Sequence, residues 1–495
     1  MKKVLLVVVV LLATVVSNAQ KVTVTKTLKA FEQAYQNKDY SAVKELLAPE
    51  FSVGYGDPSS NDFYFKVIFK AFPDLDSLQE GKSVVVKGET HTAVRFFFKG
   101  KEAKDSEIVF NKDNKMLYVS FFDSLYKVDR NAEVKKVASI PFEMIGGGIA
   151  LKIKLNNADK EFLMKFDTGA DGMALNPDSA YKAGVVVTNK KSASVVGGSQ
   201  QVEYSANNTI RIGNQTLTHQ GLVIFPRSDE FDGLFGANLL RNFITEVNFD
   251  TKTINLYNFG KFVYEGKAKP LFFDYKIGLP VVKMNLTFAD KKTVEGDFTF
   301  DTGAGYNLIA YGPFNHEFNL EESLKPDYTS TNFSLGHQTK IVGGTIPNIA
   351  INGNDFKNVT IALQEYQEDN QKWASADGSL GIELIKRFNF TIDLVHKTLY
   401  LEPNKNYNTA FSFFLSGLEL SFDNQNNLIV KKILKANNED LKKVTIGAKV
   451  IQIGDFEAKD LLHSENIQKL KNNKESIDVI LEQNSQSLLI TLKKK

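Results

Sequence analysis

The spacing of hydrophobic positions changes from helical to strand-like within the first 130 residues of the chain. Apolar residues recur at three- and four-residue intervals between Val24 and Leu47, and this spacing predicts amphipathic helices. Residues 83–87 and 92–98 alternate between apolar and polar positions instead, which is the pattern of strands. Helices followed by strands predict an α+β unit in this part of the chain.

The middle of the chain reads as short strands, and its pattern occurs twice. Residues 150–155 and 281–286 alternate, and each is followed by a polar turn and a strand that ends in Phe-Asp-Thr-Gly-Ala, at 166–170 and 300–304. Three further blocks match in the same order: 232–236 with 377–381, 243–250 with 388–393, and 252–257 with 397–401. Four matched blocks predict two copies of one all-β domain, separated by a linker near 262–270.

Each copy carries one Asp-Thr-Gly sequence, so the chain has acidic side chains at two matched positions, Asp167 and Asp301. A hydrolase that activates water with carboxylates needs one ionised and one protonated carboxyl group. Two Asp side chains that share a site meet this need, because like charges a few Å apart do not both ionise cheaply. The ionised group takes a proton from water, and the protonated group hydrogen-bonds to the scissile carbonyl.

The neighbours of the two acids suit such a site. Gly169 and Gly303 have no Cβ, so two loops can approach each other closely. Thr168 and Thr302 carry hydroxyls that can hydrogen-bond across the loops and fix their spacing. Asp171 breaks the symmetry, and a third carboxylate near the pair is expected to alter its titration.

These features resemble a retropepsin-type aspartic protease domain, in which apolar-Asp-Thr-Gly-Ala is followed by a later apolar-Gly segment, here 233–240 and 378–385. The resemblance covers about residues 136–404. It implies two tandem pepsin/retropepsin-like β-barrel lobes that build one site, with Asp167 and Asp301 as the catalytic residues. It also implies a supporting role for Thr168, Gly169, Thr302 and Gly303. A single Asp-x-Gly would read equally well as a turn, but a motif inside a repeat favours the protease fold.

The family also covers its cleft with a flexible hairpin that carries glycine. Glycine pairs stand at matching places in the two copies, and they make Gly197 and Gly198, then Gly343 and Gly344, the flap candidates. An ordinary β-turn is the alternative, since glycine pairs are common turn signals.

Two further resemblances concern the flanking regions. Residues 30–40 and 46–51 resemble the opening of nuclear-transport-factor-like (SnoaL-like) cone domains, which hold a small ligand or serve as packing modules. We favour packing because the segment shows no acid–base pair. Residues 416–420 and 447–455 resemble a PDZ-like domain. This implies a peptide-binding loop at Gly417, Leu418, Glu419 and Leu420, with simple packing on the protease as the alternative.

The predicted fold class is therefore multidomain and mainly β, with an α+β unit at either side of the lobes. Because 495 residues exceed what one hydrophobic core organises, several domains are expected. Their predicted bounds are 1–19 for a signal peptide, 20–130 for the SnoaL-like domain, 136–262 and 268–404 for the two lobes, and 407–495 for the PDZ-like domain.

The first residues predict export. Lys2 and Lys3 precede an apolar run at 4–16, and small residues at Ser17 and Ala19 suit a signal-peptidase site that leaves Gln20 first. The run is short for a membrane span, although an uncleaved anchor is the alternative. We expect a periplasmic or secreted protein without a stable membrane span after the signal is removed.

Composition removes several classes of function. The net charge is +2, and without Lys2 and Lys3 it becomes 2 − 2 = 0, so no basic field for nucleic acid is expected. The absence of cysteine excludes thiol catalysis, thiolate metal sites and disulfides. None of the six histidines forms His-Glu-x-x-His, and no Gly-x-Ser-x-Gly elbow or P-loop occurs. We therefore expect no metal and no cofactor.

The sequence thus predicts an exported aspartic endopeptidase that acts on peptides or proteins as a monomer. A PDZ-like domain that binds C-terminal peptides would aid recognition. A non-catalytic peptide-binding scaffold that kept the protease fold is the main alternative. Two others are a site formed between chains and ligand chemistry in the N-terminal domain.

Overall fold

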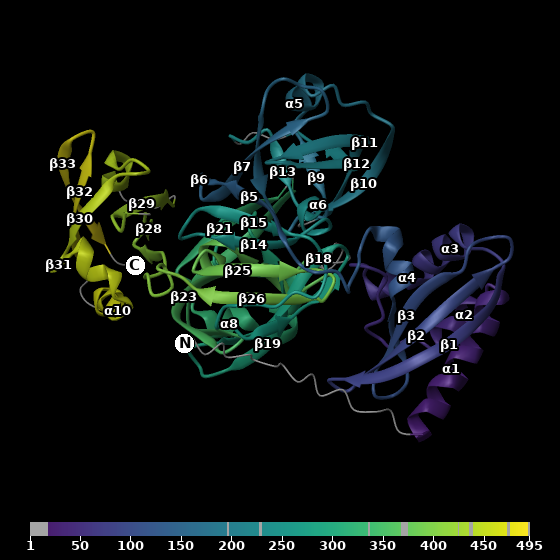
Figure 1. Ribbon diagram of the computed structural model, residues 1–495. Coiled ribbons are helices and arrows are strands. Elements are labelled where there is room, and N and C mark those ends of the chain that lie inside the picture. Colours follow the sequence, from purple (N-terminus) through teal and green to yellow (C-terminus); the bar gives the residue numbers. More distant parts are fainter. Residues whose placement is uncertain are drawn as a thin grey trace, which may run out of the picture. The chain divides into compact units, whose positions relative to one another are not determined.

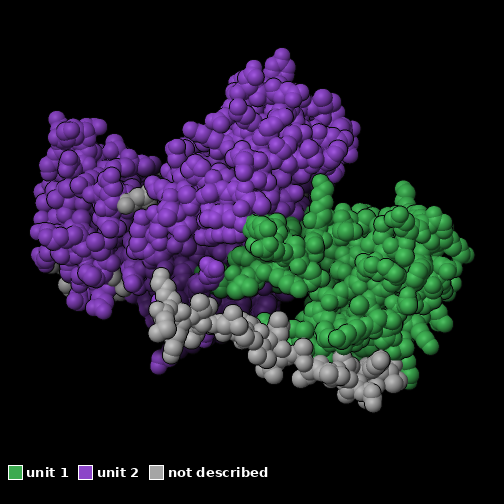
Figure 2. Space-filling model, viewed as in Figure 1, with its two compact units in different colours: residues 1–135, 258–264, 393–397 green, residues 136–257, 265–392, 398–495 purple. Residues whose placement is uncertain are grey.

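The computed structural model describes residues 18–195, 198–226, 230–334, 337–367, 375–423, 425–434, 439–472 and 476–493. It forms two compact units (Figure 2). Unit 1 combines residues 1–135 with 258–264 and 393–397, and unit 2 holds 136–257, 265–392 and 398–495. Both lobes and the C-terminal region thus fall in one unit, where the sequence suggested separate domains. Residues 1–17 of the predicted signal peptide lie outside the described residues.

Unit 1 packs helices against a four-stranded antiparallel sheet (Figure 1), in the order that the sequence predicted. The elements are α1 (Asn18–Gln36), α2 (Tyr40–Lys44), α3 (Asn61–Ala71), β1 (Leu75–Val86), β2 (Glu89–Phe98), β3 (Lys104–Phe110), β4 (Met116–Val119) and α4 (Ser120–Asp123). The side chains of Phe31, Tyr35, Phe96 and Phe122 are fully buried and hold the helices to the sheet. The resemblance of this unit to cone domains stays a prediction.

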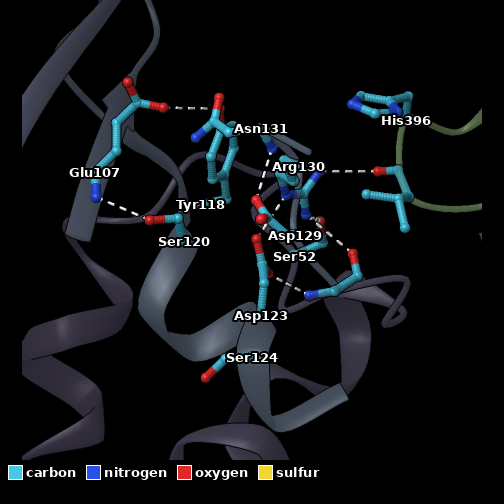
Figure 3. Close-up of polar contacts among 12 residues, drawn as sticks. Ser52, Glu107, Tyr118, Ser120, Asp123, Ser124, Asp129, Arg130, Asn131 and His396 are labelled. Atoms are coloured by element: carbon cyan, nitrogen blue, oxygen red, sulfur yellow. Dashed lines mark hydrogen bonds and ion pairs between the residues drawn. The ribbon is translucent and has the colours of Figure 1, made fainter. Parts of the chain in front are cut away.

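A buried ion pair anchors the return segments of unit 1 (Figure 3). The Arg130 side chain donates to Asp123 Oδ2 at 2.7 Å, and both side chains are almost fully buried. The same guanidinium donates to Ser52 Oγ at 3.2 Å, to the Gly54 carbonyl at 2.9 Å and to the Val395 carbonyl at 3.0 Å. One arginine therefore joins two of the three segments that compose this unit, 1–135 and 393–397.

The first lobe is an eight-stranded sheet in unit 2. Its order is β10-β11-β12-β9-β13-β8-β7-β6, and β11 also pairs with β7, so the sheet closes on itself. The strands are β6 (Glu143–Ile145), β7 (Gly148–Leu155), β8 (Phe162–Phe166), β9 (Met173–Leu175), β10 (Asn189–Val195), β11 (Gly198–Ile212), β12 (Gln215–Ile224) and β13 (Gly233–Phe235). Two short helices, α5 (Pro177–Lys182) and α6 (Ala237–Leu240), complete the lobe.

The second lobe repeats this topology strand for strand. Its order is β21-β22-β23-β20-β24-β19-β18-β17, closed by pairing of β18 with β22. The elements are β17 (Asp274–Lys276), β18 (Leu279–Thr287), β19 (Thr293–Asp301), β20 (Leu308–Ala310), α7 (Gly312–Phe318), α8 (Leu320–Leu324), β21 (Tyr328–Ser334), β22 (His337–Ile351), β23 (Asn354–Gln364), β24 (Gly378–Gly381) and α9 (Ile382–Ile385). The repeated sequence blocks thus correspond to a repeated arrangement of strands, and the prediction of a mainly β protein is confirmed.

A six-stranded sheet takes three strands from each half of the repeat. Its order is β16-β26-β25-β14-β15-β5, and β14 pairs with β25 in the register Thr245↔Ile392 to Val247↔Phe390. The strands are β5 (Lys136–Pro141), β14 (Ile244–Asn248), β15 (Thr253–Tyr257), β16 (Pro270–Phe272), β25 (Phe388–Asp393) and β26 (Thr398–Pro403). This shared sheet fixes the two lobes to each other through backbone hydrogen bonds.

The C-terminal region of unit 2 is a further sheet with one helix beside it. The strand order is β27-β28-β29-β30-β32-β33, and β31 pairs with β30. The elements are β27 (Phe413–Leu415), β28 (Leu418–Phe422), β29 (Leu428–Ile433), β30 (Lys449–Ile453), β31 (Phe456–Glu457), α10 (Ser464–Asn472), β32 (Ser476–Gln483) and β33 (Gln486–Lys493). Among the described residues, no helix combines the length and the apolar character needed to cross a membrane.

Candidate active site

Two rigid strands deliver the two Asp-Thr-Gly loops to one place. Asp167 directly follows β8, and Asp301 is the last residue of β19. The preceding Phe166 and Phe300 are fully buried in their lobes. Each strand is also held by a parallel partner, with Phe166 opposite Phe235. The acidic side chains therefore project from fixed strand ends rather than from free loops.

The threonines of the two loops bond to each other's backbone. The Thr168 backbone N–H donates to Thr302 Oγ1 at 3.0 Å, and the Thr302 N–H donates to Thr168 Oγ1 at the same distance. Each hydroxyl then donates to the carbonyl before the opposite Asp, Thr168 to Phe300 at 2.5 Å and Thr302 to Phe166 at 2.9 Å. Both threonines are fully buried. Four hydrogen bonds thus lock the spacing of the two loops.

The glycines of the motif allow the two carboxyl groups to meet. A Cβ placed on Gly169 would lie 2.4 Å from Cγ of Asp301, and one on Gly303 would lie 2.1 Å from Cγ of Asp167. Any side chain at either position would collide with the opposite acid, because real Cβ contacts do not fall below about 3.0 Å. Each carboxyl group is therefore seated against the backbone of the other loop.

The electrostatics of the pair fit a shared proton. Desolvation in the site, followed by the charge of Asp167, raises the pKa of Asp301 well above the usual value of a carboxyl group. The two carboxyl groups are also in hydrogen-bond contact. Gly303 N–H donates to Asp301 Oδ1 at 2.8 Å, and Gly169 N–H donates to Asp167 Oδ1 at 3.0 Å. The arrangement suits one proton held between two acids.

Two further acids explain part of the sequence repeat. Asp232 Oδ2 accepts a hydrogen bond from the Leu163 N–H at 2.8 Å, and Asp377 Oδ2 accepts one from the Asp297 N–H at 2.7 Å. Leu163 and Asp297 lie on the strands that lead to the two Asp-Thr-Gly loops. The repeated Asp-Gly blocks therefore brace the strands that carry the reacting acids, a role that the sequence alone did not assign.

Asp171, which the sequence marked as a departure, has its own partner. Its carboxylate forms an ion pair with Arg241 Nη2, and Arg241 Nε donates to the Tyr275 hydroxyl at 3.2 Å. The Asp171 side chain is 58% exposed. Its charge is therefore compensated and largely solvated, which weakens the expectation that it perturbs the catalytic pair.

A lysine that the sequence analysis did not single out reaches across the lobes. Lys165 lies on β8 two residues before Asp167, and its Nζ donates to the Gly303 carbonyl at 2.6 Å. The matching residue of the second lobe is Thr299, so this contact exists in one direction only. Comparison of the two repeats would have revealed the difference in residue type, but not the contact.

The glycine pair of the second lobe lies within a strand rather than at a hairpin end, and its role in a flap stays a prediction. Gly343 and Gly344 lie within β22, where Gly343 pairs with Tyr328 on one side and Ala362 on the other. A Cβ on Gly343 would lie 1.9 Å from the Tyr328 ring, which explains why glycine is needed there. The hairpin of β21 and β22 closes instead beyond the pair Ser334↔His337.

The first-lobe flap candidates fall at a hairpin end. Gly198 is the first residue of β11 and pairs with Val195, the last residue of β10. Gly197 lies outside the described residues. The position of Gly198 agrees with the predicted hairpin, and its role as a flap stays a prediction.

The predicted peptide-binding loop is part of a tight hairpin. Gly417 stands between β27 and β28, and Leu418, Glu419 and Leu420 lie on β28. Along the edge of β28, Leu418 pairs with Leu415 and Leu420 with Phe413 of β27. Strand β27 thus already occupies the edge that an added peptide strand would use at these residues. Peptide binding at this loop stays a prediction, and it requires β27 to move.

Strand β29, the other neighbour of β28, contacts the second lobe within unit 2 through Lys431. Lys431 Nζ lies 3.4 Å from Glu419 Oε1 and 3.6 Å from Glu383 Oε1. Glu383 lies on α9, close to the second Asp-Thr-Gly loop. Its N–H donates to the Tyr306 carbonyl, which follows that loop, at 3.2 Å. Burial would raise the pKa of Glu383, but the charges of Lys386 and Lys431 outweigh burial and lower it to about 2. A compensated buried charge therefore links the C-terminal sheet to the catalytic lobe.

Comparison with known proteins agrees with this site. Residues 151–239, which span most of the first lobe and include Asp167, match the model of the aspartyl protease family. Among solved structures, the chain is similar to the aspartic proteinase from Irpex lacteus, with 12% identity, 55% of this chain and 98% of that chain covered, and a TM-score of 0.38. No curated protein matches. The family match and the two facing loops together support an aspartyl protease.

In the part of the chain that the structure describes, His, Asp and Glu side chains form no cluster of three or more that could hold a metal ion.

Proposed function

We propose that this protein is an aspartic endopeptidase in which Asp167 and Asp301 activate water for the hydrolysis of peptide bonds. The observation that carries the proposal is the contact between the two carboxyl groups, held by the cross-bonded pair Thr168 and Thr302. Both acids come from one chain, so the proposed enzyme acts as a monomer.

The chemistry follows from one proton shared by the pair. The ionised carboxylate removes a proton from a water molecule, and the water oxygen attacks the scissile carbonyl carbon. The protonated carboxyl group donates its hydrogen bond to the carbonyl oxygen and stabilises the oxyanion of the tetrahedral intermediate. Cleavage of the C–N bond transfers a proton to the leaving amine, and the pair returns to its starting charge.

The test is cleavage of a peptide library, read by mass spectrometry, with Asp167→Asn and Asp301→Asn as single variants. Each is expected to lower kcat/KM by at least about 10³-fold, because the pair acts as a unit. Asp171→Asn is the matched control, since it removes a carboxylate from the same loop. Wild-type activity in either dyad variant would contradict the proposal, and tight peptide binding without turnover by the wild type would favour the scaffold alternative.

We also propose that the protein is exported and loses residues 1–19. The support is the order of Lys2 and Lys3, the apolar run at 4–16 and the small residues before Gln20. N-terminal sequencing of the protein from the exported fraction is expected to begin at Gln20. A chain that retains Met1 in that fraction would contradict cleavage.

For the C-terminal sheet we propose a role in peptide recognition by addition of a strand to β28. The support is the resemblance of the loop at Gly417 to the PDZ-like pattern and the short partner strand β27, which holds β28 through three residue pairs. Calorimetry with the full chain and a peptide that carries a free C-terminal carboxylate tests this role. The amide form of the same peptide is the control, and equal binding of both forms would contradict a carboxylate-binding loop.

A further inference from the structure

A hydroxyl from outside both Asp-Thr-Gly loops contacts the catalytic pair. Ser379 lies on β24, beside β19, where it pairs with Thr299 two residues before Asp301. Its side chain is fully buried, and its Oγ donates to Asp301 Oδ2 at 3.2 Å. Gly303 N–H already donates to the other oxygen, Oδ1. Both oxygens of Asp301 are therefore oriented by donors of its own lobe.

Two tyrosines lie beside the Ser379 hydroxyl. The side chains of Tyr306 and Tyr311 lie within hydrogen-bonding reach of Ser379, and the charge of Asp301 acts on both. Desolvation raises the pKa of each phenol, so both keep their protons over the range in which proteins are stable. A phenol that donates to Ser379 Oγ leaves the single serine proton free to point at Asp301. Such a chain of donors strengthens the last hydrogen bond.

The first lobe lacks this hydroxyl. Its matching strand β13 carries Leu234, which pairs with Lys165 as Ser379 pairs with Thr299. A leucine side chain has no hydrogen-bond donor. The two halves of the site therefore differ in residue type at this matched position of β13 and β24.

We propose that Ser379 is a positioning residue for the hydrolysis: its hydroxyl fixes the Asp301 carboxyl group against Asp167 and sets the pH above which the pair leaves its active, singly protonated form. This inference rests on the proposed function. The titratable groups that act on Asp301 are Asp167 from the first lobe and Tyr306 and Tyr311 from the second.

The direction of the effect follows from the donor. A hydrogen bond donated to a carboxylate stabilises the ionised form, so the Ser379 hydroxyl helps Asp301, which holds the shared proton beside the charged Asp167, to lose that proton. Without the Ser379 hydroxyl, the pair keeps its shared proton to a higher pH. The basic limb of the pH profile of kcat/KM, which reports the loss of this proton in the free enzyme, then moves upward.

The experiment compares Ser379→Thr with Ser379→Val, two side chains of nearly equal shape that differ in the hydroxyl. The valine variant is expected to move the basic limb upward by about one pH unit and to lower kcat about 10-fold, with KM little changed. The threonine variant is expected to keep the wild-type limb. Ser379→Ala, which adds no bulk, must behave as the valine variant does.

A second readout needs no activity. The difference in free energy of unfolding between the threonine and valine variants is expected to widen as the pH rises from about 6 to about 10, because the hydroxyl stabilises Asp301 in its charged form and the pKa of this acid in the folded state is raised to about 8. A pH-independent difference, or equal loss of kcat in both variants, would overturn the inference and indicate packing alone. A wild-type chain that cleaves no peptide would overturn the proposed function, whereas the unfolding comparison would still decide the role of Ser379.

Discussion

Thr168 and Thr302 are each donor and acceptor to the other, with two reciprocal N–H···Oγ1 contacts of 3.0 Å in a fully buried setting. Neither loop can shift without breaking bonds made by the other. The distance between the two catalytic acids therefore depends on a pair of uncharged hydroxyls.

Replacement of one of these hydroxyls tests that dependence. Thr302→Val leaves the Thr168 N–H buried without its acceptor, so the free energy of unfolding is expected to fall by about 1–3 kcal/mol, and kcat to fall with it. Urea denaturation and peptide cleavage measure the two effects. Thr302→Ser keeps the hydroxyl and serves as the control. A valine variant with wild-type kcat would show that the loops keep their spacing by other means.

The raised pKa of Asp301 predicts that this residue opposes folding at neutral pH. An acid whose pKa is higher in the folded state costs no stability below its unfolded pKa, and its cost grows as the pH rises toward the folded value. Asp301→Asn should therefore increase the free energy of unfolding at about pH 7 by at least about 1 kcal/mol, although activity is lost. Near pH 3 the gain should vanish. Asp171→Asn, measured in the same denaturation series, should show no such gain.

The contact from Lys165 to the Gly303 carbonyl predicts a cost for losing the ammonium group. Lys165→Met keeps most of the aliphatic stem and is expected to lower the free energy of unfolding by about 1–2 kcal/mol and to reduce kcat, because the second loop loses a charged donor. Lys154→Met, at an exposed position of β7, is the control. Equal behaviour of the two variants would contradict a role for the cross-lobe contact.

The lowered pKa of Glu383 predicts that the free energy of unfolding depends on pH in the acidic range. A carboxyl group with a depressed pKa stabilises the fold above its unfolded pKa of about 4.5, and this contribution is lost as the pH falls toward about 2. At about pH 7, Glu383→Gln is expected to cost up to about 3 kcal/mol, and the cost should shrink steadily below about pH 4. Lys431→Met should reproduce part of the cost. Parallel stability curves for wild type and Glu383→Gln across this range would exclude the ion-pair explanation.

The buried pair of unit 1 predicts a larger effect than an exposed pair of the same unit. Arg130→Met leaves Asp123 buried without its main compensating charge, and a loss of about 3–5 kcal/mol is expected in urea denaturation of the full chain. Arg95→Met breaks the exposed pair with Asp105 and should leave stability almost unchanged, because solvent screens the two charges. If both variants cost the same, burial does not determine the value of these pairs.

The sequence predicted the parts of the site that depend on residue type at fixed spacing. In Asp-Thr-Gly, the glycine lets the two loops approach closely and the threonine supplies a hydroxyl for a hydrogen bond across them. The repeat of this motif at Thr168 and Thr302 therefore indicated by itself that the two loops meet. The sequence did not show that Gly343 lies within a strand, because a glycine pair serves two needs equally well, a turn or close packing under a ring such as Tyr328. Local sequence does not distinguish these two needs.

Other features were visible only as differences between the copies or were not visible at all. Ser379 stands where the first copy has Leu234, and a comparison of the repeats could have revealed it. Two contacts depend on packing between segments far apart in sequence. They are the hydrogen bond from Lys165 to a carbonyl in the other lobe and the ion pair of Lys431 with Glu383. Periodicity and motifs carry no information on such contacts.

The sheet to which both lobes contribute three strands also has a consequence for the timing of activity. Strands β25 and β26 lie at Phe388–Asp393 and Thr398–Pro403, so the sheet cannot close until more than three quarters of the polypeptide has left the ribosome. An emerging chain therefore carries Asp167 long before the scaffold that holds it against Asp301 is complete.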